Sequence, residues 1–419
     1  MKLLLKLLSF CMIAFFFAFT GMAQTIQLTG KNNTVDYNKL NRIDSLVNSY
    51  VEKKWLTGAV TIIIKDNMVV QNKGYGYADR DAKTPMQKDQ LFRIMSQTKA
   101  ITSVGIMILY EQGKLLLDEP IANYIPEFKN PTVIDKFNEA DTTFTTVPAK
   151  RDITIRDLLT HTSGIDYGDI GTKTGRLIYA KYKIPSGLGH IDANLLDRMK
   201  ALGKLPLIHQ PGEKFSYGLN TDLLGCLIEV ISGETLDAFL RKNIFEPLGM
   251  KDTYFTVPAE KAKRLASVYT EDDQHNIIPW SHTFRGIDPD YPTMKTNYFS
   301  GGAGLTSTAF DYAVFMQMLL NGGIYNGHRI LAPRTVEMMT TNQLKEGNFG
   351  DRHFGLGFEI ANGMAARNAN SFGWGGYYGT TYWADPKSKL VCLFMTQHTP
   401  NTHGDIEPRF ENMVYSCLK

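Results

Sequence analysis

Two pairs of strand-like segments, one near each end of the chain, restrict the fold more than any other feature. The run GAVTIIIKDNMVVQNKGYGYAD at 58–79 predicts two strands joined at Asp66-Asn67. The run GTTYWADPKSKLVCLFMTQ at 379–397 predicts a second pair that turns at Asp385-Pro386. Strands at both ends favour one antiparallel sheet built from the two termini.

The segments between these strands are mostly helical in pattern. Apolar residues recur at helical spacing before a Gly or Pro stop in four runs, at 153–164, 220–233, 235–250 and 308–323. Helices are also expected at 40–53 and, as a closing element, at 407–418. The fold class is therefore α+β: an antiparallel sheet from both chain ends, flanked by helices, with a mainly helical subdomain inserted between them.

No repeat or long linker divides the chain, so we expect one discontinuous domain over 40–419 after a polar segment at 24–39. Its sheet lobe covers about 40–92 and 350–419, and its helical lobe covers about 93–349. A cleft between the two lobes is the expected place for a site.

The first 23 residues have the pattern of a secretory signal peptide. Lys2 and Lys6 precede an apolar stretch that ends at Phe19, and Gly21-Met22-Ala23 supplies a small-residue cleavage signal. The alternative is an uncleaved membrane anchor, which needs about 20 apolar residues. We expect an exported protein, periplasmic or extracellular, with no stable membrane association once the leader is cleaved.

Composition and motif content exclude several functions. The net charge of +3 falls to about +1 when the leader's two lysines leave, and no basic cluster remains, so nucleic acid is not an expected partner. The cysteines of the mature chain are scattered through apolar segments and are expected to be buried and inert: Cys226, Cys392 and Cys417. No zinc-binding or nucleotide-binding motif occurs, so we expect no metal and no cofactor.

The sequence Ser96-Gln97-Thr98-Lys99 begins a helix whose apolar period runs to a stop at Gly113. Residues three apart on a helix lie about 5–6 Å apart at Cβ, so the Lys99 amine can reach the Ser96 hydroxyl. A hydroxyl paired with a base is the arrangement of a serine nucleophile. The helix macrodipole favours the alkoxide that forms at such a position. The alternative, structural role for Ser96 is that of a helix cap.

Four further segments follow Ser96 in order: ITIRDLLTHTSG at 153–164, PGEKFSYGLNTDLLG at 211–225, GGAGLTSTAFDYAVFMQMLLNGG at 301–323 and FGWGGYYGTTYWADP at 372–386. Together with SQTK they resemble the serine β-lactamase and penicillin-binding-protein superfamily, and in particular the class C β-lactamase-like esterases. The resemblance covers nearly the whole mature chain. It implies a covalent acyl-enzyme on Ser96.

The resemblance also assigns roles to other residues. Lys99 and Tyr217 would be the acid/base pair, and Lys99 can act as a base only when it is neutral. Asn220 lies one residue later than the asparagine of the usual Tyr-x-Asn motif, where Leu219 stands instead. This displacement weakens the case for a β-lactam or peptide substrate, but Asn220 remains a candidate substrate contact.

Trp374-Gly375-Gly376 aligns with the third motif, which is Lys-Thr-Gly in the lactamases. In that alignment the backbone N–H groups of Ser96 and Tyr377 would form the oxyanion hole. Trp374 replaces a cation by an aromatic wall, so the pocket is expected to prefer uncharged, apolar acyl or alcohol groups. The alternative is a Trp that only packs into the sheet.

Other candidates are interpreted as structural. His161 invites a catalytic-triad interpretation, but in this family its segment is a helix end and turn. The glycines at 301, 302 and 304 match the family's turn before a helix and complete no phosphate loop.

Three functions are open on the sequence. The first is a secreted carboxylesterase on small-molecule esters. The second is a D-Ala-D-Ala carboxypeptidase, D-amidase or β-lactamase that acts on amides, including cell-wall-derived ones. The third is a non-catalytic penicillin-recognising protein, which the displaced Asn220 and the missing lysine would suit.

Overall fold

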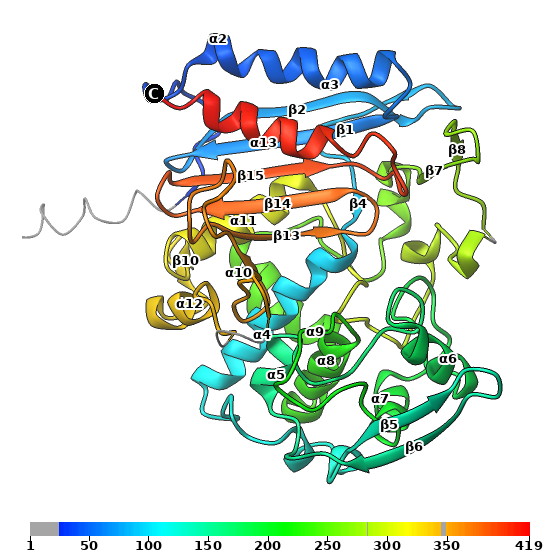
Figure 1. The fold of residues 1–419 in the computed structure, drawn as a ribbon. Coiled ribbons are helices and arrows are strands. Elements are labelled where there is room, and N and C mark those ends of the chain that lie inside the picture. The colour runs from blue at the N-terminus through cyan, green and yellow to red at the C-terminus, as the bar shows by residue number, and fades with distance from the viewer. Residues whose placement is uncertain (1–24, 283, 345–348) are drawn as a thin grey trace, which may run out of the picture.

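A computed structural model describes residues 25–282, 284–344 and 349–419. The predicted signal peptide at 1–23 lies outside these ranges. The chain forms a sheet covered by helices above a second, mainly helical part, and the C-terminus lies beside the sheet (Figure 1). Within the described ranges, no helix is both long and apolar enough to cross a membrane.

The central sheet has seven antiparallel strands in the order β12-β13-β14-β15-β1-β2-β3. Strand β1 lies between β2 and β15, with Val60 opposite Met395, so the two chain ends meet in the sheet as predicted. The predicted turn after β1 is present, with φ of 52° at Asp66 and 60° at Asn67. The strands are β1 (Gly58–Lys65), β2 (Met68–Asp79), β3 (Thr84–Pro85), β12 (Glu359–Ile360), β13 (Phe372–Gly376), β14 (Thr380–Asp385) and β15 (Leu390–Met395).

Helices cover both faces of this sheet. Alternate residues of β1 point to opposite sides: Ala59 and Ile63 pack with α3 and α13, whereas Val60 and Ile62 belong to the larger core on the other side. The helices on the outer face are α2 (Tyr37–Leu40), α3 (Arg42–Glu52) and α13 (Ile406–Ser416). They confirm the helices expected at 40–53 and 407–418, with a break at Asn41. The inner face carries α11 (Ala309–Leu320), which packs on β1, β14 and β15 although its sequence position falls in the predicted helical lobe.

The helical part is built around α4, which is buried from Thr98 to Leu109. It crosses α8 closely at Gly105, where a Cβ would come within 2.9 Å of the Ile228 side chain. Its elements are α4 (Thr98–Glu111), α5 (Ile155–Leu159), α6 (Lys173–Lys181), α7 (Leu195–Gly203), α8 (Asn220–Ser232), α9 (Leu236–Leu240), α10 (Glu246–Leu248) and α12 (Pro333–Met339). A π-helical stretch, Arg241–Phe245, links α9 to α10 because Pro247 lacks the N–H that an α-helix needs there.

Several short strand pairs lie outside the central sheet. The largest is a hairpin of β5 (Thr132–Asn138) and β6 (Thr143–Pro148), which the sequence analysis did not anticipate in a helical region. The other pairs are β4 (Phe92–Arg93) with β9 (Thr306–Ser307), β7 (Tyr269–Glu271) with β8 (Ile277–Pro279), and β10 (Ile324–Tyr325) with β11 (His328–Arg329). Cys226, Cys392 and Cys417 are free and buried, as expected.

Candidate active site

Ser96 lies where the chain enters the buried helix α4. It is the middle residue of a short 3-10 turn, η1 (Met95–Gln97), and Lys99 follows in the first turn of α4. Met95 has a positive φ of 48°, which a side-chain-bearing residue rarely adopts, so the chain bends sharply just before Ser96. Ser96 is partly exposed whereas its neighbours from Leu91 to Ala100 are buried. The turn therefore presents the Ser96 hydroxyl at an opening in the core.

The Lys99 amine is buried and faces Ser96. Its Nζ lies 3.4 Å from Ser96 Oγ and donates hydrogen bonds of 2.8 Å to the Tyr167 hydroxyl and to the Gly302 carbonyl. The amine also lies 4.6 Å from the centre of the Tyr217 ring. The structure therefore brings together Ser96, Lys99 and Tyr217, the three residues predicted to carry the chemistry.

Tyr167 is a member of this group that sequence reasoning missed. It is fully buried in the loop after α5, and its hydroxyl bonds directly to Lys99 while its ring packs 5.5 Å from that of Tyr217. Burial raises the pKa of Tyr167 well above its ordinary value, so its hydroxyl is protonated at neutral pH. The only available signal was its place three residues after the segment 153–164, which is too weak to single it out.

Trp374 connects the sheet to Tyr217. It lies on β13, and its indole Nε1 donates a 3.2 Å hydrogen bond to the Tyr217 hydroxyl. The residues from Trp374 to Tyr377 are partly exposed, whereas the preceding residues of β13 are buried. The tryptophan is thus packed against the sheet and also partly exposed at the site. Both interpretations of its sequence position, a packed residue and a wall of the pocket, therefore apply.

The glycine-rich end of β13 lies directly against the turn that carries Ser96. A Cβ on Gly376 would come within 2.5 Å of the Ile94 carbonyl oxygen, so only glycine permits this contact. Gly375 precedes it on the same strand and Tyr377 follows it. This closeness is what an oxyanion hole formed by the N–H groups of Ser96 and Tyr377 requires, and that assignment stays a prediction.

His161 packs against the ring of Tyr217. Its ring is buried, 4.8 Å from that of Tyr217, and burial with the nearby charges of Lys99 and Arg352 lowers its pKa well below the ordinary value. The ring is therefore neutral, and its Nδ1 lies 3.0 Å from the Asn220 amide nitrogen. The histidine thus packs beneath Tyr217, which suits the structural role expected for it.

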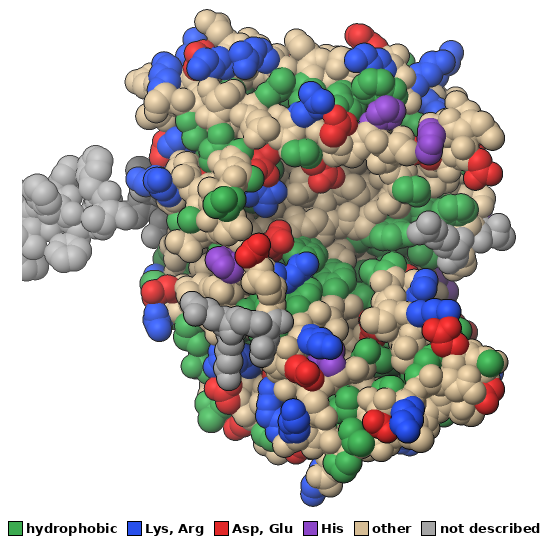
Figure 2. All heavy atoms as spheres, in the orientation of Figure 1, with side chains coloured by type: hydrophobic (Ala, Val, Ile, Leu, Met, Phe, Trp, Pro, Cys, Tyr) green, Lys and Arg blue, Asp and Glu red, His purple; other side chains and the backbone are tan. Residues whose placement is uncertain are grey.

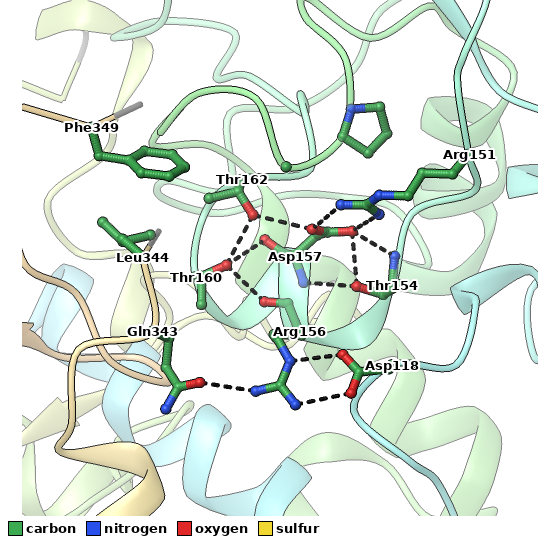
Figure 3. A pocket seen from close by; sticks show the side chains of 12 residues that line it. Asp118, Arg151, Thr154, Arg156, Asp157, Thr160, Thr162, Gln343, Leu344 and Phe349 are labelled. Atoms are coloured by element: carbon green, nitrogen blue, oxygen red, sulfur yellow. Dashed lines mark hydrogen bonds and ion pairs between the residues drawn. The ribbon is translucent and has the colours of Figure 1, made fainter. Parts of the chain in front are cut away.

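A hollow crosses the middle of the face that Figure 2 shows, between the sheet and the helical part, with hydrophobic side chains in its floor. A separate pocket of about 440 Å³ lies beside α5. In that pocket Arg151 and Thr162 both contact Asp157, and Arg156 spans Asp118 and Gln343 (Figure 3). These charged groups already have partners, so the pocket stabilises the turn at 160–162. It does not have the arrangement of a catalytic cleft.

One group of described side chains has the types and spacing of metal ligands. His282, Asp288 and Asp290 lie close together, with His282 Nδ1 2.8 Å from an Asp288 oxygen. Asp290 also lies 3.9 Å from the Arg93 guanidinium, and His282 is mostly exposed. A hydrogen bond and an ion pair are enough to account for this arrangement.

Comparison with known proteins places the chain in a family. The sequence model of the family described as Beta-lactamase matches residues 43–412, nearly the whole chain. The chain belongs to the β-lactamase family. Protein Rv1367c of Mycobacterium tuberculosis is 36% identical over 367 residues, which are 84% of this chain and 88% of that protein.

Two further relatives have names that describe activities. Esterase EstB of Burkholderia gladioli is 28% identical over 370 residues, which are 85% of this chain and 89% of EstB. The solved structure of EstCE1, described as a hydrolase with promiscuous acyltransferase activity, superimposes with a TM-score of 0.77 at 25% identity. The superposition covers 91% of this chain and 99% of EstCE1. These likenesses confirm the β-lactamase-like fold and support an enzyme of this hydrolase family.

One predicted contact of this β-lactamase-family site is corrected by the structure. Asn220 is fully buried at the start of α8, and its side chain bonds to Ser163, His161 and the Ser216 carbonyl. Its amide is therefore used inside the protein and does not face a substrate. The extra residue in the motif places Asn220 inside the helix start, behind Tyr217.

Proposed function

We propose that this protein is a serine hydrolase that cleaves carboxylic esters through an acyl-enzyme on Ser96. The observation that carries the proposal is the partly exposed Ser96 hydroxyl, 3.4 Å from a buried lysine amine that also contacts two tyrosines. The esterase among the relatives supports the ester class, and the hydrolase among the solved structures supports a hydrolytic reaction.

The proposed reaction has two halves. Ser96 Oγ attacks the ester carbonyl and forms a C–O bond while its proton passes to the group of Lys99, Tyr167 and Tyr217. The C–O bond to the alcohol then breaks, and the same group returns that proton to the departing alkoxide. Water then attacks the acyl-enzyme, releases the acid and returns the proton to Ser96. Donors at the turn of Ser96 and at Tyr377 would stabilise the oxyanion in both halves.

The substrate preference follows from the third motif. Trp374 presents an aromatic surface where a lysine would attract a carboxylate, and its indole N–H is already bonded to Tyr217. We infer that the pocket prefers uncharged, apolar acyl or alcohol groups. Small to medium acyl esters fit this description better than peptides that end in a carboxylate.

The test compares the wild type with Ser96→Ala on p-nitrophenyl butyrate, with circular dichroism to show that the fold is kept. We expect the variant to lose turnover. Unchanged hydrolysis in a folded variant would contradict the assignment of Ser96.

Parallel assays separate the remaining functions. Turnover of nitrocefin or of a D-Ala-D-Ala peptide, with inert esters, would favour the lactamase or peptidase alternative. Failure of a fluorophosphonate probe to label Ser96 would favour a non-catalytic penicillin-recognising protein.

We also propose that the protein is exported by the leader at 1–23 and acts in the periplasm or outside the cell. The intact mass of protein recovered from the producing cells tests this. We expect a chain that begins at Gln24, and a mass that retains residues 1–23 would favour the anchor alternative.

A further inference from the structure

A buried carboxylate that the proposed reaction does not use lies behind Lys99. Asp222, the third residue of α8, is fully buried, and neither of its oxygens makes a hydrogen bond of normal geometry within the described residues. A Cβ on Gly302 would lie 2.4 Å from Asp222 Oδ2 and 3.4 Å from Lys99 Nζ. The carboxylate and the amine therefore lie close to the same point, which only glycine leaves free.

The other titratable groups that face Asp222 are phenols. Tyr298 lies beside it from the segment before the glycine turn, and Tyr167 lies beside it from the loop after α5. Burial raises the pKa of both tyrosines well above the ordinary value, and the negative charge of Asp222 adds to this, so both remain neutral. Arg198 of α7 acts on Tyr298. Among the described groups whose charge acts on Asp222, Lys99 is the cation.

A buried carboxylate with few hydrogen bonds is unfavourable. Burial raises the pKa of Asp222 to about 6, and the charge of Lys99 opposes that rise, followed by polar contacts from the Ser300 hydroxyl and the Gly302 N–H. Above this pH the ionised carboxylate lies buried beside the amine of Lys99. A buried charge persists when an opposite charge compensates it, and each partner then favours the charged form of the other.

We propose that Asp222 is a positioning residue, whose carboxylate holds Lys99 as an ammonium ion between Ser96 and the tyrosines. In this state Lys99 stabilises charge on Ser96 and is not the neutral base that the sequence analysis expected. The ammonium donates to the Gly302 carbonyl and to the Tyr167 hydroxyl and directs its remaining N–H toward Ser96 Oγ. There it stabilises the negative charge that develops on Ser96 during acylation. This last step rests on the proposed function, whereas the pairing of Asp222 with Lys99 does not.

A double-mutant cycle tests the pairing without any substrate. Urea unfolding midpoints are measured at pH 8 for the wild type, Lys99→Met, Asp222→Asn and the double variant. Lys99→Met leaves Asp222 without its counter-ion, so we expect a lower midpoint that Asp222→Asn largely restores. Independent, additive shifts of the midpoint would overturn the proposal.

Asp311 provides the matched control for this cycle. It is also a buried aspartate with a pKa raised to about 6 by burial, but it lies on α11 and accepts a 2.6 Å hydrogen bond from the Asp252 N–H. Asp311→Asn is expected not to restore the stability of Lys99→Met. Equal restoration by both substitutions would show a general effect of removing buried carboxylates and would overturn the pairing.

The pH dependence of acylation tests the functional part. A fluorophosphonate forms an Oγ–P bond at Ser96 as fluoride and the serine proton leave, and intact mass follows the rate from pH 5 to 10. We expect Asp222→Asn to slow labelling at least tenfold at pH 8 and to move the alkaline fall in rate to lower pH. Asp311→Asn should retain the wild-type profile.

The possible failures are distinguishable. Wild-type labelling with an unchanged or faster rate in Asp222→Asn would overturn the positioning role. A wild type that takes no label would instead refute the proposed function, and the unfolding cycle would still decide whether Asp222 and Lys99 are paired.

Discussion

The Ser96 site and the pocket beside α5 hold similar residue types but arrange them differently. In the pocket, Asp157 accepts two hydrogen bonds from Arg151 and others from Thr154, so the charges of Asp157 and Arg151 compensate each other. At the Ser96 site, a lysine amine contacts a hydroxyl, a phenol and a carbonyl, and the acid lies behind a glycine.

The difference shows that an open cavity does not identify a catalytic site. A bidentate ion pair with further hydrogen bonds has little capacity left for a ligand and stabilises the local fold. A buried amine that directs an N–H toward a partly exposed hydroxyl is available for chemistry at that hydroxyl. Substitutions in the two regions should therefore change different quantities.

The largest effect is expected from Lys99→Met. It removes the group that contacts Ser96, so kcat/KM for p-nitrophenyl butyrate should fall at least about a thousandfold, as when a member of a catalytic group is removed. Steady-state kinetics measure this. Arg151→Met in the pocket is the control, and an equal loss of kcat/KM there would break the comparison.

Asp157→Asn should mainly reduce stability. It removes charge-assisted bonds to Arg151 and weakens the cap at Thr154, but Arg151 is 44% exposed and can be solvated, so the free energy of unfolding should fall by about 2 kcal/mol. Urea unfolding and ester hydrolysis together check this, because kcat/KM of the folded variant should change by less than about threefold. Loss of activity at full stability would assign this pocket a direct functional role.

Asp222→Asn should instead change how stability depends on pH. Because the pKa of Asp222 is raised to about 6 in the fold, its contribution to stability is present at low pH and is lost as the pH rises through 6. The variant lacks this loss. From pH 4 to pH 8 its free energy of unfolding should therefore rise by up to about 2 kcal/mol relative to that of the wild type, because each unit of pKa shift corresponds to about 1.4 kcal/mol. Urea unfolding at both pH values measures this, and a relative stability that falls over the same range would contradict it.

Tyr167→Phe should reduce kcat/KM about tenfold to a hundredfold. It removes one 2.8 Å hydrogen bond to the lysine amine, and bonds to charged groups contribute about 1.5–3 kcal/mol. Tyr179→Phe is a matched control, since that buried hydroxyl bonds to the Asp166 N–H away from Lys99. Similar losses in both variants would indicate a packing effect.

The smallest effect is expected from Trp374→Phe. The substitution keeps an aromatic surface but removes the 3.2 Å bond to Tyr217, a neutral bond that contributes about 0.5–1.5 kcal/mol. kcat should fall about twofold to tenfold with little change in KM. A loss comparable with that of Lys99→Met would show that the indole N–H takes part directly in the reaction.

Much of the fold was predictable because its signals are local. The Asp66-Asn67 turn and the apolar strands on either side define β1 and β2, and the same reasoning gives β14 and β15. The hairpin β5–β6 escaped prediction because its strands are largely exposed and lack a regular apolar alternation. The two strands pair locally across residues 139–142, and Val133 also bridges Leu207.

The candidate site was predictable only where sequence spacing sets geometry. Ser96 and Lys99 lie one turn apart on the same segment, so their contact follows from the sequence. Tyr167 and Asp222 reach Lys99 from other elements, and no spacing rule connects them to it. Asn220 was misassigned because one additional residue moved it from the cleft into the start of α8.

The central claim is that Ser96 is the nucleophile, and the most direct measurement is to map the covalent adduct. The protein is treated with a fluorophosphonate, digested and analysed by mass spectrometry, with Ser96→Ala in parallel. We predict one adduct, on the peptide that contains Ser96, and none in the variant. An adduct on another residue, or equal labelling of Ser96→Ala, would contradict the account.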